Sequence, residues 1–174
     1  MVSSSASPPP SSSEQIHTLG KRFLDPTISV PQRIRLLFTL KSLPSPETIQ
    51  YLSTFLEQLD ESILIKHEAA YALGQMHDPR AIPYLIKVLE NEKQDCITRH
   101  EAAEALGNLG GMDLVEVLER FVGMEVEQRV RETCQIAIEK LKWMDRRKRG
   151  EVKMGKENPV FTSVDPAPPA TSEE

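Results

Sequence analysis

The sequence carries one residue pattern that could do chemistry, a histidine followed by a glutamate, and it carries this pattern twice. His67-Glu68 and His100-Glu101 are 33 residues apart, and each pair opens a run of the form Ala-Ala-x-Ala-Leu-Gly. Neutral imidazoles together with carboxylates suit non-haem iron, zinc or manganese, and a carboxylate-rich set favours iron used in oxygen chemistry over structural zinc. The four side chains are therefore a candidate metal site.

A single His-Glu pair would carry little information, because surface histidines need no special explanation. The repetition at matching positions is more informative. The segments one repeat earlier and one repeat later have Ile34-Arg35 and Glu132-Thr133 in these places. The scaffold depends on the Ala-Leu-Gly positions and not on the pair, so the doubling favours a function for the four residues.

The pairs lie within a longer repetition that predicts the fold. Amphipathic segments recur at 33–40, 67–74, 100–107 and 130–138, and apolar residues at spacings of three and four predict a further helix before the last three of them, at 47–58, 81–89 and 113–121. No strand pattern competes. The tetratricopeptide and ankyrin signatures are absent. We expect an all-α fold, an α-solenoid of about four HEAT-like helical-hairpin repeats with disordered termini.

The helical period also places the candidate residues. At about 100° per residue, His67 falls on the side opposite the core stripe, together with Ala70 and Gly74, so we expect its imidazole to project from a surface cleared of bulk by these small neighbours. Glu68 falls at the border of the stripe. Stacked helices lie about 10 Å apart, so the two pairs should be adjacent on one wall. The expected core stripe consists of Ile65, Ala69, Ala72, Leu73 and Met76.

Composition divides the chain into three segments. Of its 174 residues, 39% are hydrophobic and 27% charged, which suits one small globular domain. We expect a disordered Ser/Pro-rich segment at 1–13, the HEAT-like repeat domain at 14–145, and a basic, then Pro-rich tail at 146–174. The basic run 146–149 is interpreted as the solvated end of a helix, because its positive charge complements the helix dipole. This interpretation is preferred to a nuclear import signal.

Several classes of function are disfavoured. Twenty-one basic against 26 acidic residues give a net charge of −5, which argues against nucleic acid as a partner. No run approaches the roughly 18 apolar residues of a membrane span, so no membrane partner and a cytoplasmic location are expected. Cys96 and Cys134 lack metal-like spacing and are expected to be reduced thiols. The sequence contains no Gly-rich phosphate loop, Gly-x-Ser-x-Gly elbow or His-Glu-x-x-His helix.

At the two His-Glu motifs the sequence resembles deoxyhypusine hydroxylase, a HEAT-repeat di-iron monooxygenase. Segments 66–76 and 99–107 look like the first two His-Glu motifs of that family with their flanks. The segment 163–170, Ser-Val-Asp-Pro-Ala-Pro-Pro-Ala, looks like the linker between the family's two halves. The resemblance extends over residues 14 to 170.

The resemblance implies an activity and roles for individual residues. In the family, four His-Glu motifs, two in each half of the chain, hold two irons that activate dioxygen. His67, Glu68, His100 and Glu101 would accordingly be iron-site residues for two ferrous ions, with dioxygen as co-substrate. The implied partner is the deoxyhypusine form of translation initiation factor 5A, whose modified lysine is hydroxylated to hypusine. An acidic cleft would suit a substrate that carries amines.

The chain also departs from the family pattern, because it stops where the second set of repeats should begin. It therefore resembles the N-terminal half with the inter-half linker. We expect such a half to be inactive unless the missing C-terminal half or a second copy completes the site. Two alternatives without this chemistry remain: a non-catalytic HEAT-repeat protein-interaction module, and a HEAT protein resembling phycobilin lyases. The second explains neither the His-Glu pairs nor the tail.

Overall fold

The computed structural model describes residues 12–151, and this part of the chain is helical throughout, without any strand. Four hairpins follow one another along the sequence, each made of two antiparallel helices. Only the third hairpin adds a short 3-10 turn, η1, before its first helix. The elements are α1 (Ser12–Leu24), α2 (Val30–Lys41), α3 (Pro46–Glu57), α4 (Ile63–Gln75), η1 (Pro79–Ala81), α5 (Ile82–Glu90), α6 (Cys96–Leu109), α7 (Asp113–Met124) and α8 (Gln128–Lys148).

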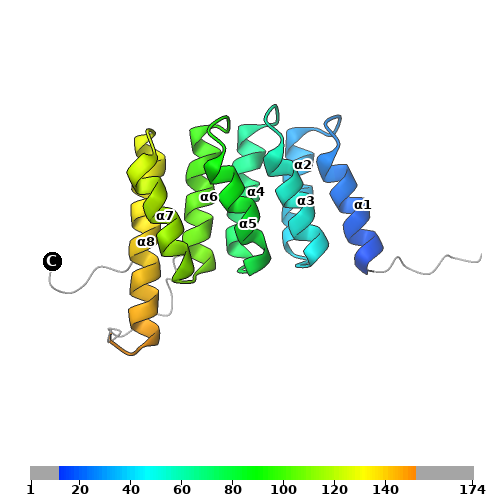
Figure 1. Ribbon diagram of the computed structural model, residues 1–174. Coiled ribbons are helices and arrows are strands. Elements are labelled where there is room, and N and C mark those ends of the chain that lie inside the picture. The colour runs from blue at the N-terminus through cyan, green and yellow to red at the C-terminus, as the bar shows by residue number, and fades with distance from the viewer. Residues whose placement is uncertain (1–11, 152–174) are drawn as a thin grey trace, which may run out of the picture.

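The hairpins stand side by side in a row that runs from α1 to α8 (Figure 1). The second helices form one layer, in which α4 packs between α2 and α6, and α6 packs between α4 and α8. The first helices of the hairpins form a second layer, which packs on the layer of second helices. They are α1, α3, α5 and α7. Helix α8 has 21 residues and extends past the ends of the other helices (Figure 1). The α-solenoid expected from the sequence is confirmed.

The ends of several helices follow from single residues. The Ser45 hydroxyl accepts a hydrogen bond of 3.0 Å from the Thr48 amide, and the Asp95 carboxylate accepts one of 2.8 Å from the Thr98 amide. Such caps satisfy amides that have no partner within the helix. At the other end of α6, Gly110 has φ of 83°, a left-handed conformation that glycine adopts without strain and that stops the helix.

Core formation follows the apolar period of each helix. Of the stripe expected in α4, Ile65, Ala69, Ala72 and Leu73 are fully buried, whereas Met76 is only partly buried. The residues buried on the other helices recur with the same spacing and join these four in one continuous core. Examples are Leu36, Leu37 and Leu40 in α2, Leu52, Phe55 and Leu56 in α3, and Ala102, Ala105 and Leu106 in α6.

The prediction that the small residues of α4 lie on an exposed surface is wrong. Ala70 and Gly74 are buried against the neighbouring helix, and a Cβ built on Gly74 would lie 2.9 Å from the Ala105 Cα atom. Gly107 approaches Ala137 of α8 in the same way, with its would-be Cβ 2.9 Å from the Ala137 Cβ atom. A helix that packs against a single layer would leave these small residues exposed. In the solenoid a central helix is covered on three sides, so its small residues allow close helix packing.

Three buried cations, here called the cation ladder, hold α2, α4 and α6 against the helices that precede them. Sequence analysis missed this feature. Arg33, Lys66 and Arg99 occupy the same repeat position, and none is more than 6% exposed. Each donates to a backbone carbonyl in or just after the last turn of the preceding helix, where a cation complements the helix dipole. The acceptors are the carbonyls of Phe23 at 2.8 Å, Leu59 at 3.0 Å and Leu89 at 3.1 Å.

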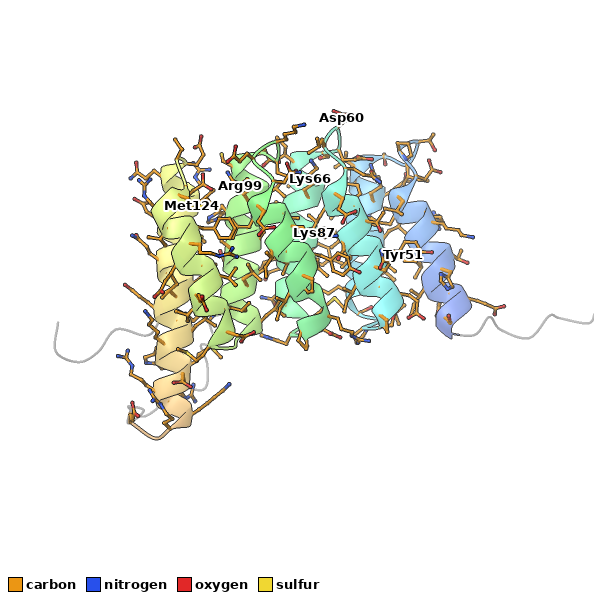
Figure 2. All side chains as sticks on the ribbon, in the orientation of Figure 1. Tyr51, Asp60, Lys66, Lys87, Arg99 and Met124 are labelled. Carbon is orange, nitrogen blue, oxygen red and sulfur yellow. The ribbon has the colours of Figure 1, made fainter. Side chains whose placement is uncertain are left out.

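The same three cations also reach forward to the next hairpin. Each contacts a side chain in the loop of that hairpin, so the ladder joins every repeat to its successor. Figure 2 shows Lys66 and Arg99 at similar heights near one end of their helices. Because these two residues directly precede His67 and His100, their hydrogen bonds also help to fix the backbone position of both histidines. The forward partners are Glu61 for Arg33, Gln94 for Lys66 and Glu125 for Arg99.

The segment boundaries expected from composition can be compared with the helices only in part. Ser12 and Ser13, expected in a disordered segment, open α1, and the basic run begins inside α8, which ends at Lys148. The rest of the Ser/Pro-rich start, and the Pro-rich part of the tail with its segment 163–170, lie outside the described residues. Within residues 12–151, no helix combines the length and the apolar character needed to cross a membrane.

Candidate metal centre

The close packing of α4 and α6 brings the two His-Glu pairs together. The His67 Nε2 atom lies 2.9 Å from the Glu101 Oε2 atom, and the His67 Nδ1 atom lies 3.4 Å from the Glu68 Oε1 atom. The expected adjacency of the two pairs on one wall is thus confirmed. Their metal-binding role stays a prediction.

Glu101 is the buried member of the group. It is 3% exposed, and this burial raises its pKa to about 7, with the charges of Glu104 and Glu68 acting in the same direction and His67 opposing them. Three carboxylates thus gather around one buried position, where their negative charges are mutually unfavourable. A bound cation would relieve that repulsion, and the oxygen and imidazole donors on offer are those that iron, manganese and zinc accept.

Glu104 belongs to the same cluster, although sequence analysis did not select it. One ligand atom each from His100, Glu101 and Glu104 lies within 4.8 Å of the other two. Glu104 follows His100 by four residues and so falls on the same face of α6 one turn later. It stands at the repeat position of Tyr71. Because Glu104 differs between the two repeats, residues shared by both repeats give no indication of it.

The environment of His100 favours the neutral form of its imidazole. Burial lowers the pKa of His100, and the positive charge of Arg129 and the interaction with His67 lower it further. Metal ligation requires a neutral imidazole, because only that form has a free lone pair. The His100 Nδ1 atom lies 2.6 Å from the Thr133 hydroxyl oxygen of α8. His100 is thus held by the helix that follows it.

The other two histidines lie away from this cluster. His17 is exposed on α1, with its Nδ1 atom 3.0 Å from the Tyr51 hydroxyl. His77 is exposed after α4, with its Nδ1 atom 3.2 Å from the Asn108 carbonyl. Both contacts join neighbouring elements, and neither partner is a carboxylate. His77 is therefore a suitable control for the candidate site.

Comparison with known families identifies the class of protein. The model of HEAT repeats matches residues 25–97 and 52–139, which together span most of the four hairpins. The chain belongs to the HEAT-repeat family.

Within this class the chain is similar to deoxyhypusine hydroxylases. It is 40% identical over 157 residues to "Deoxyhypusine hydroxylase" of Homo sapiens, covering 90% of this chain and 49% of the human one. The Drosophila melanogaster protein of that name is 37% identical over 162 residues, covering 93% of this chain and 51% of its own length. The chain spans about half the length of the curated relatives it matches. The resemblance indicated by the two motifs is confirmed.

A solved structure supports the same relationship. The structure of human deoxyhypusine hydroxylase in complex with glycerol matches with a TM-score of 0.80 and 39% sequence identity. The match covers 94% of this chain and 54% of the human chain. Fold and sequence therefore agree on the same relative.

Proposed function

We propose that this chain provides one wall of the iron centre of a deoxyhypusine hydroxylase. The reaction would be hydroxylation of the deoxyhypusine residue of translation initiation factor 5A, with two ferrous ions and dioxygen. The observation that carries the proposal is the meeting of the two His-Glu pairs across α4 and α6, where the His67 Nε2 and Glu101 Oε2 atoms are 2.9 Å apart. A HEAT-repeat scaffold that only binds proteins has no need of this buried carboxylate beside two imidazoles.

Each member of the wall has a role that follows from its surroundings. The imidazoles of His67 and His100 would be direct ligands, and the buried Glu101 carboxylate would ligate in its ionised form, which a bound metal would favour. Glu68 is more accessible, with a side chain 24% exposed, and can ligate or hold a proton beside His67. Bound iron would supply the activation of dioxygen that no amino-acid side chain provides.

Glu104 extends the acidic character of the wall. Together with Glu68 and Glu101 it gives this face the negative charge that suits a substrate side chain carrying amines. The solenoid holds these groups on regular helices, which fixes their spacing more firmly than loops would. The same rigidity would keep the reacting carbon of the substrate in one place relative to the metal.

The wall needs a counterpart. Two imidazoles and two or three carboxylates supply fewer ligand atoms than two octahedral irons require. We propose that more polypeptide of the same family pattern or a second copy of this chain supplies further ligands. Activity therefore has to be measured with that counterpart present.

A chimaera provides the test. The part of human deoxyhypusine hydroxylase that matches this chain is exchanged for residues 14–170, and the product is assayed with ferrous iron, dioxygen and the deoxyhypusine form of the initiation factor. We expect the factor to gain the mass of one oxygen atom. A folded chimaera that leaves the factor unchanged would contradict the proposal.

The variants His100→Ala and Glu101→Gln should abolish this gain in the chimaera. His77→Ala is the matched control, because it removes an imidazole from the same solenoid without touching the wall. Loss of activity in the control to the same extent would mean that the chimaera reports on folding and not on the site.

A further inference from the structure

The contact between His100 and Thr133 determines more than the position of the imidazole. Thr133 is 5% exposed on α8, and its hydroxyl oxygen lies 2.6 Å from the His100 Nδ1 atom. The same hydroxyl donates a hydrogen bond of 2.9 Å to the backbone carbonyl of Arg129, one turn earlier in α8. A hydroxyl has a single proton. Since Arg129 receives it, the hydroxyl can only accept from His100.

The direction of this bond fixes the tautomer of the imidazole. The Nδ1 atom must carry the proton that the hydroxyl accepts, so the Nε2 atom keeps the free lone pair. A metal-ligating histidine commonly donates its other ring N–H to a neighbouring acceptor in this manner, and such acceptors affect metal affinity. Here the acceptor comes from the fourth hairpin, which has no His-Glu pair.

We propose that Thr133 is a positioning residue for the metal centre, which holds His100 in the Nδ1–H tautomer and so presents the Nε2 atom as the ligand. The inference rests on the proposed function in that it takes His100 as a ligand. It also explains why the fourth hairpin differs from the second and third. Thr133 stands at the repeat position that Glu101 has in the third hairpin, and its hydroxyl contacts His100.

The Thr39 hydroxyl gives a matched control. It makes the same kind of bond within its own helix, donating to the Arg35 carbonyl at 2.8 Å, but it is exposed on α2 and touches no imidazole. Thr39→Val and Thr133→Val therefore remove equivalent intrahelical hydrogen bonds with the same change in side-chain shape. Only Thr133→Val removes the acceptor of His100.

The first measurement needs no metal. Two-bond proton–nitrogen correlation spectra of the metal-free, nitrogen-15-labelled chain report which ring nitrogen of each histidine is protonated. In the wild type and in Thr133→Ser we expect His100 to carry its proton on Nδ1. In Thr133→Val we expect that preference to be lost, while Thr39→Val should match the wild type. A His100 protonated on Nε2 in the wild type would overturn the inference.

The second measurement uses cobalt(II) alone as a spectroscopic probe of the site. Removal of such a supporting hydrogen bond typically weakens metal binding by about 10- to 100-fold. We expect a loss of that size for Thr133→Val and less than about threefold for Thr133→Ser. Equal affinity of Thr133→Val and the wild type would overturn the inference. Thermal unfolding of each variant shows whether a loss reflects the fold.

The two measurements separate the inference from the function on which it rests. If the wild type binds no cobalt(II) although His100 carries its proton on Nδ1, the proposed metal site fails while the contact stands. If cobalt(II) binds and the tautomer is the other one, the site stands and the role of Thr133 is wrong.

Discussion

Substitution of Gly74 by alanine tests the close packing of α4 and α6 on which the candidate centre depends. A Cβ at this position would lie 2.9 Å from both the Cα and Cβ atoms of Ala105. Carbon atoms in favourable contact are about 3.5–4.0 Å apart, so the two helices would have to separate by roughly 0.6–1 Å. That movement would lengthen the contact between His67 and Glu101, now 2.9 Å.

The size of the effect follows from two opposing contributions. Overpacking of a tight contact costs about 1–3 kcal/mol. Alanine gains about 1 kcal/mol over glycine within a helix. We expect Gly74→Ala to lower the free energy of unfolding by about 1 kcal/mol, equivalent to a drop in melting temperature of roughly 3–5 °C for a domain of this size.

Gly123 is the matched control, because a Cβ on this residue of α7 would meet no atom within 4 Å. Gly123→Ala keeps the gain in helix propensity without the clash, so it should raise the free energy of unfolding by about 1 kcal/mol. Urea unfolding followed by circular dichroism measures both variants. If Gly74→Ala were as stabilising as Gly123→Ala, the tight approach of α4 and α6 would be refuted.

Three further outcomes are expected. Arg99→Met should lower the free energy of unfolding by about 3 kcal/mol in urea titrations, because it leaves the Glu125 carboxylate buried without its cation. The hydrogen bonds from Arg33 hold the pKa of Glu61 below its ordinary 4.5, so this pair stabilises the fold above pH 4.5 and the contribution is lost as the pH falls further. Melting temperatures of Glu61→Gln should show a shallower acid decline. Burial raises the pKa of Cys134 to about 12, so iodoacetamide at pH 8 should label it only in denaturant, as peptide mass spectrometry would report.

The fold could be predicted from the sequence because it depends on repetition. The apolar period of each helix and the spacing between matching segments specify which faces are buried and which helices are neighbours. That is why the adjacency of the two His-Glu pairs, which lie in different hairpins, could be predicted, whereas the particular contact of His67 with Glu101 comes from the structure. Neighbouring repeats in a solenoid can stack in few ways, and matching positions therefore meet.

Features that depend on differences between repeats could not be predicted in this way. Glu104 and Thr133 replace the residues that strict repetition would put at their positions, and their roles emerge only from side-chain distances. Ala70 and Gly74 were misplaced for another reason. A helical period gives the direction of a side chain around its own helix, and it does not say how many neighbours surround that helix.

Lys66 illustrates a third limit. A lysine before the His-Glu pair reads as a solvated charge, yet it is 1% exposed and donates to the Leu59 carbonyl and the Gln94 side chain. Such a burial depends on acceptors from two loops, and the acceptors are not marked in the sequence. Lys66 belongs to a repeated feature because Arg33 and Arg99 are buried at the same repeat position.

Anaerobic loading of the 174-residue chain with ferrous iron, followed by native mass spectrometry, tests the central claim most directly. The spectrum counts chains and irons at once. We predict that the wild type and the control His77→Ala retain iron, and that a variant combining His67→Ala with His100→Ala retains none. Equal iron in the double variant and the wild type would contradict the claim that these two pairs form a metal-binding wall.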